Sequence, residues 1–147
     1  MGKLALLVVI GAAGFGGWML TGKKHSDAYL AYEKFSDALL ENRHHDAGLL
    51  AVGQGALALV EEQKVMHARY GAMMGEVSYA ARTVESETAS ADGKQVTLVV
   101  SVDCRRGGAP AGPPNVRYKH RVAMVQTEQG WMVDSFEEES TPLTKSE

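Results

Sequence analysis

The chain has 147 residues, a formal net charge of -3 at pH 7 and one cysteine, Cys104. Its pI is near 6.0, which gives no electrostatic basis for binding nucleic acid, because a domain that neutralises phosphates is expected to be basic. A single cysteine excludes an internal disulfide and any zinc site built on cysteine pairs.

The first feature along the chain is an uncharged, mostly apolar segment. Leu4 to Gly22 lie between Lys3 and the pair Lys23-Lys24. As a helix this segment would span about 28 Å, close to the roughly 30 Å of a bilayer's hydrocarbon core. It predicts a membrane anchor over residues 1–24. A cleaved export signal is the alternative, but Trp18 followed by two lysines is more typical of an interfacial anchor and stop.

Small residues within this segment indicate close helix packing. Ala12 with Gly16, and Ala13 with Gly17, have the four-residue spacing that lets membrane helices approach each other. The alternative is that glycine is simply common in membrane helices. Lysines flank both ends, so charge alone does not fix the orientation. We expect a short cytoplasmic head and a single-pass protein of a bacterial inner membrane, with its domain in the periplasm.

Helical patterns follow the predicted anchor. Ser26 is placed to cap a helix that ends near Asn42, with one apolar stripe made of Ala28, Tyr32, Phe35 and Leu39. Asp46 is placed to cap a short helix to about Ala51. After interrupting glycines, a third helix is expected from about Gln54 to Ala68 or Tyr70.

Strand patterns fill the second half of the chain. An alternating segment from Val77 to about Glu87 predicts a half-buried strand, and Asp92-Gly93 marks a reversal. A second strand then places one apolar face inward, made of Val96, Leu98, Val100 and Val102. Glycines and prolines from Arg105 to Pro114 predict a flexible loop.

Two more strands complete the pattern. The third, from Val116 to Thr127, has a wet face and an inner face, the inner one made of Val116, Tyr118, His120, Val122 and Met124. A turn at Glu128-Gln129-Gly130 leads into the fourth strand, which begins at Trp131. The predicted organisation is an anchor over 1–24, a domain over 25–139 and a polar tail over 140–147.

Helices followed by antiparallel strands predict an α+β domain, with helices packed on one face of a curved sheet of about four strands. The order of these elements resembles the nuclear-transport-factor-2-like fold, also called the cystatin-like cone. The first helix, with residues 32–40, is similar to that family's opening helix, and Gly130-Trp131 is similar to the start of its last strand. Type IV pilins are a weaker comparison, because the early acidic residue expected in a pilin's apolar stretch is missing.

The resemblance suggests where a ligand pocket would lie. Enzymes of this family hold an acid or base inside the cone, so His120 is the inward-facing candidate, with the pocket completed by Tyr79, Tyr118 and Trp131. A lone histidine on an apolar face is more often a hydrogen-bonded core residue, so we predict no catalytic residue and no cofactor. His44-His45-Asp46 lacks zinc-type spacing, and a turn between helices explains these residues without a metal.

A second set of residues suggests a docking surface. Arg117, Lys119 and Arg121 form a basic ladder on the wet face of their strand, and Arg105 with Arg106 adds two cations in the predicted loop. Pairing with the acidic run Glu137–Glu139 is the ordinary explanation. An acidic partner or lipid headgroups would also fit.

These observations favour a non-enzymatic accessory or scaffold subunit of a bacterial membrane complex. It would contact other membrane subunits and the bilayer, bind no nucleic acid, and could also associate with itself. The alternative is an exported domain with a small-molecule or isomerase-type pocket, which requires a hollow interior, whereas a scaffold can fill it.

Overall fold

A computed structural model describes residues 25–107 and 112–143. It contains three helices followed by four strands, so the predicted α+β class is confirmed for this part of the chain. The anchor, the small-residue pairs Ala12/Gly16 and Ala13/Gly17, and the last four residues of the predicted tail lie outside the described residues. Within the described ranges, no helix combines the length and hydrophobicity that crossing a bilayer would require.

The first described helix, α2 (Asp27–Leu40), begins where the sequence predicts. The Ser26 side chain accepts a hydrogen bond from the Tyr29 backbone N–H at 3.1 Å, which caps the helix. The predicted apolar stripe is buried, and Tyr32 and Phe35 are fully enclosed. After α2, Asn42 adopts a positive φ of 61° and turns the chain.

Helix α3 (His44–Leu49) starts earlier than predicted. Asp46 lies inside its first turn rather than at its cap, because the Arg43 backbone N–H already bonds the Ala38 carbonyl at 2.7 Å and closes the turn. The Asp46 carboxylate instead accepts a hydrogen bond from the Arg43 guanidinium at 3.0 Å. Its prediction as a helix cap was therefore wrong.

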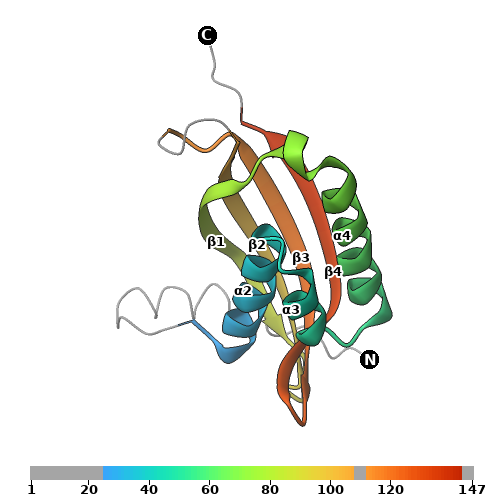
Figure 1. Ribbon diagram of the computed structural model, residues 1–147. Helices are drawn as coiled ribbons and strands as arrows, with labels where there is room; N and C mark the ends of the chain where they lie inside the picture. Colours follow the sequence, from blue (N-terminus) through green and yellow to red (C-terminus); the bar gives the residue numbers. More distant parts are fainter. Residues whose placement is uncertain (1–24, 108–111, 144–147) are drawn as a thin grey trace.

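Helix α4 (Gln54–Met74) is longer than predicted and only half packed. It runs through Gly71 and ends at Gly75, whose φ of 79° favours glycine. Its start is buried against the sheet through Ala56 and Val60. Beyond Val60, the helix lies along the last strand with largely exposed side chains (Figure 1).

The four strands form one antiparallel sheet in the order β1-β2-β3-β4. They are β1 (Val77–Ala89), β2 (Gln95–Arg106), β3 (Val116–Thr127) and β4 (Gly130–Pro142). Strand β4 continues three residues past the predicted domain end at 139. Arg105 and Arg106 belong to β2, so their assignment to a flexible loop was wrong. The reason is that Asn115 bonds both the N–H and the carbonyl of Arg106, at 2.9 Å each.

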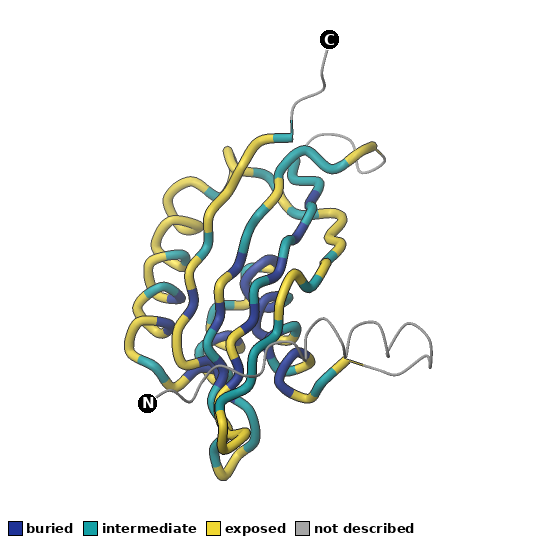
Figure 2. The backbone as a smooth tube through the Cα atoms, turned by 180° about the vertical axis from the view of Figure 1, so that it is seen from behind, coloured by how far each residue is buried: buried dark blue, intermediate teal, exposed yellow. Residues whose placement is uncertain are grey.

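The helices cover one face of the curved sheet, and the other face is open (Figures 1 and 2). The inward alternation of β2 and β3 is confirmed, since Leu98, Val100, Val102 and Val122 are at most 1% exposed. The core lies between these side chains and α2. Because α2 crosses this face, polar groups on it meet the inner residues of the sheet.

Candidate functional site

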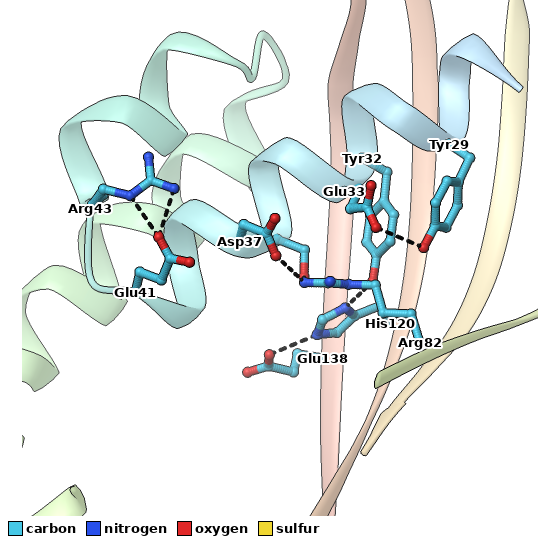
Figure 3. Close-up of polar contacts among 10 residues, drawn as sticks. Tyr29, Tyr32, Glu33, Asp37, Glu41, Arg43, Arg82, His120 and Glu138 are labelled. Carbon is cyan, nitrogen blue, oxygen red and sulfur yellow. Dashed lines mark hydrogen bonds and ion pairs between the residues drawn. The ribbon is translucent and has the colours of Figure 1, made fainter. Parts of the chain in front are cut away.

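A buried chain of polar contacts links α2 to the sheet. The Tyr32 hydroxyl lies 2.7 Å from Nδ1 of His120, and Nε2 of His120 lies 2.9 Å from Oε2 of Glu138 (Figure 3). A carboxylate can only accept, so we assign the imidazole proton to Nε2. Nδ1 then accepts from the Tyr32 hydroxyl. Burial raises the pKa of Tyr32 to about 12, so this phenol keeps the proton that it donates.

The chain of contacts continues to α4. The Gln63 amide donates to Oε1 of Glu138 at 3.2 Å, so each oxygen of this carboxylate holds one partner. His120 is 1% exposed, and its ring also packs against Tyr118 and Phe136. His120 is therefore a hydrogen-bonded core residue. Glu138 connects it to Gln63 of α4.

A second polar contact involves Arg82 of β1. Its guanidinium donates to the Ser36 hydroxyl at 2.7 Å and to the Asp37 carboxylate at 2.8 Å (Figure 3). The Arg82 side chain is 8% exposed. Its Cζ atom lies 5.9 Å from the ring centroid of Tyr32. Because a buried cation needs a paired anion, Asp37 fixes the position of β1 relative to α2.

A cavity of about 320 Å³ lies between the second half of α4, the end of α2 and the sheet. Its polar lining includes Glu138, Gln63, Tyr118 and Arg106. Apolar side chains complete the wall, among them Leu39, Leu59, Met66 and Met74. The Arg106 guanidinium donates to the Tyr118 hydroxyl and to the Gly75 carbonyl, both at 3.1 Å. Burial raises the pKa of Tyr118.

The predicted pocket residues do not all converge. Tyr118 and His120 stack with centroids 6.2 Å apart. Trp131 lies opposite Gln126, six positions along β3 from His120, which corresponds to about 20 Å. Tyr79 is 49% exposed on the edge strand β1. The structure therefore keeps Tyr118 in a cavity, encloses His120 behind Glu138, and places the other two elsewhere.

The basic ladder is paired toward β2 and β1. Arg117 contacts Asp103 at 2.6 Å, and Lys119 contacts Glu85 at 3.4 Å. A hydrogen bond from Arg117 lowers the pKa of Asp103. The register also places Glu139 opposite Lys119 and Glu137 opposite Arg121. Together, the carboxylates on β1, β2 and β4 offset the positive charge of the basic ladder. Arg105 lies opposite Tyr79, at the far end of β2.

The sequence analysis missed Tyr32, Glu138 and Arg82 as parts of a polar site. Tyr32 was assigned to the apolar stripe, although a buried tyrosine hydroxyl needs a partner. Glu138 was interpreted as one member of an acidic run, but it lies two residues after the buried Phe136 on β4 and therefore points inward. This alternation along the strand was the available signal. Arg82 carried no comparable signal.

His44 and His67 approach each other, with ring centroids 5.8 Å apart. Burial and the nearby His67 lower the pKa of His44. No group of three or more histidine, cysteine, aspartate or glutamate side chains in residues 25–107 and 112–143 could hold a metal ion.

A comparison with models of known protein families found no match for this chain, and a comparison with curated proteins found none either. The family resemblance thus remains a prediction.

Proposed function

We propose that this chain is a non-enzymatic, membrane-anchored accessory or scaffold subunit of a bacterial membrane complex that acts through protein contacts. The observation that carries the proposal is the uncovered second half of α4. Met73 is 82% exposed, and Val65 and Tyr70 are 44% and 42% exposed. Large exposed apolar patches in soluble domains commonly mark interaction sites. Methionine adapts well to a partner's surface.

The rest of the proposal concerns location and family. The apolar segment Leu4–Gly22 supports a single-pass anchor. The short head before it, residues 1–3, favours a domain in the periplasm. The order of three helices and four antiparallel strands supports a nuclear-transport-factor-2-like fold. The enclosed His120 supports a structural role for this residue, because substrate would have to pass Glu138 to reach it.

Purification of the full chain from native membranes in mild detergent, followed by mass spectrometry, tests the contact surface. Met73→Asp places a charge on the exposed α4 surface, and Gln129→Asp places the same charge in the exposed β3–β4 turn as a matched control. We expect membrane subunits to co-purify with the unchanged chain and with Gln129→Asp, and to be lost with Met73→Asp. Equal recovery with both variants, or purification of the chain alone, would contradict the proposal.

The cavity supports a second candidate, an exported domain that binds a small molecule. Its volume of about 320 Å³ is at the lower end of the range of ligand pockets, and it combines apolar walls with a few convergent polar groups. Native mass spectrometry of the full chain released from detergent would detect a retained molecule. Met66→Trp should fill the cavity and displace it. If the unchanged chain shows only the mass of its own sequence, or if Met66→Trp retains the same added mass, the candidate is contradicted.

A further inference from the structure

The cavity beneath α4 has both an apolar and a polar lining. Leu39 and Leu59 with the thioethers of Met66 and Met74 supply the apolar lining. The second half of α4 stands away from the sheet here, since its buried residues, Ala56 and Val60, both belong to its first half. A ligand with an apolar body would remove this surface from water, which favours binding.

The Glu138 carboxylate is held in position before any ligand enters. Glu138 is oriented by hydrogen bonds from His120 at 2.9 Å and from Gln63 at 3.2 Å. An ionised carboxylate has about four acceptor sites, so two remain for a ligand. The Glu138 side chain is 20% exposed, which leaves it accessible from the cavity.

The charges around the cavity favour a cation. Two carboxylates line it, those of Glu62 and Glu138, against the single guanidinium of Arg106. That guanidinium already donates to Tyr118 and to the Gly75 carbonyl. His44 and His67 also line the cavity. Burial lowers the pKa of His44, so that ring adds no positive charge at neutral pH. A bound anion would lie beside two like charges, which is unfavourable.

We propose that this cavity binds a small amphipathic amine. Its ammonium group donates to Glu138, with Glu62 as the second carboxylate, and its apolar body packs against Leu59, Met66 and Met74. A charge-assisted hydrogen bond to a carboxylate is stronger than a neutral one. The volume limits the ligand to a compact molecule. This inference rests on the second candidate function and specifies its ligand class.

Three probes with one common body test the ligand class. Benzylamine, benzyl alcohol and benzoate are added separately to the full chain in mild detergent, and Kd is measured by calorimetry alongside the shift in Tm. We expect benzylamine to bind about tenfold more tightly than benzyl alcohol, which corresponds to roughly 1.4 kcal/mol, and benzoate to bind most weakly.

Three variants test the site. Glu138→Gln keeps an acceptor for His120 but removes the charge, so the preference for the amine over the alcohol should fall sharply, and Glu62 should account for what remains. Glu62→Gln should weaken amine binding several-fold without involving the contact to His120. Glu61→Gln is the matched control, because Glu61 lines a separate groove between α3 and α4, and should bind like the unchanged chain.

The failures are distinguishable. If none of the three probes binds, both the small-molecule-binding function and the assignment of an amine ligand are refuted. If benzyl alcohol or benzoate binds as tightly as benzylamine, the pocket stands and the amine assignment is refuted. Amine binding that survives both Glu62→Gln and Glu138→Gln would also refute it.

Discussion

Replacing Tyr32 with phenylalanine would test whether the buried chain of contacts stabilises the fold. The ring would still fill its place between α2 and the sheet, but Nδ1 of His120 would lose the hydroxyl that lies 2.7 Å away. Tyr32 is 0% exposed and His120 is 1% exposed. Water therefore cannot replace the lost partner without opening the core.

The cost follows from this burial. A buried acceptor left without a partner costs about 1–3 kcal/mol. A loss of about 2 kcal/mol would lower the Tm of a chain of this size by roughly 6–10 °C. Tyr29→Phe is the matched control on the same helix, because its hydroxyl lies 3.5 Å from a Glu33 oxygen, at the limit of a hydrogen bond.

The free energy of unfolding should be measured by urea titration of the full chain in mild detergent, with thermal melts alongside. We expect Tyr32→Phe to be clearly less stable than Tyr29→Phe. A further double variant, Tyr32→Phe with Glu138→Gln, should be non-additive, because both groups contact His120. A difference below about 0.5 kcal/mol between the two single variants would refute the reasoning, since that is the size of ordinary surface effects.

Stability should fall as pH rises from about 10 to about 12, because folding raises the pKa of Tyr32 from 10.0 to about 12. The contribution of this shift to stability, about 3 kcal/mol, is complete below pH 10 and lost above the folded pKa. Urea titrations of Tyr32→Phe should therefore show a smaller decline. Gly53→Ala should destabilise the fold by about 1–3 kcal/mol, because a Cβ there would clash with the backbone carbonyl of Asp134. Gly48→Ala, with nothing within 4 Å, should be neutral or stabilising in the same urea assay. Burial raises the pKa of Cys104 to about 11, so this thiol should react with a thiol reagent only after unfolding. The new thiol of Ser78→Cys, at an exposed position of β1, should react at once. Equal reaction rates of this thiol and Cys104 in the folded protein would contradict the assignment.

Local patterns were sufficient to predict most of the secondary structure. Ser26 and the apolar stripe of α2 predicted that helix because a capping hydroxyl and a 3.6-residue period are properties of neighbouring residues. The inner faces of β2 and β3 followed from alternation in the same way. Asp46 failed as a cap because the turn before α3 is closed by Arg43 and Ala38, a contact that its own neighbourhood does not reveal.

The candidate site was predicted only in part. The sequence indicated that Tyr118 and His120 share an inner face, since residues two apart on a strand point the same way. It could not show that Tyr32, 88 positions before His120, supplies the hydroxyl. Nor could it show that the cavity lies near the opposite end of the sheet from Trp131, because the cavity depends on how α2 and α4 pack on the sheet.

The sequence by itself determined the α+β class, the inner faces of β2 and β3 and the absence of an internal disulfide, because these depend on composition and on short periodic patterns. Only the tertiary structure decided that Glu138 lies between His120 and a cavity, that Asp37 holds Arg82, and that half of α4 remains uncovered. These features depend on how far α2 and α4 approach the sheet. That distance is set by packing between segments that are remote in the sequence.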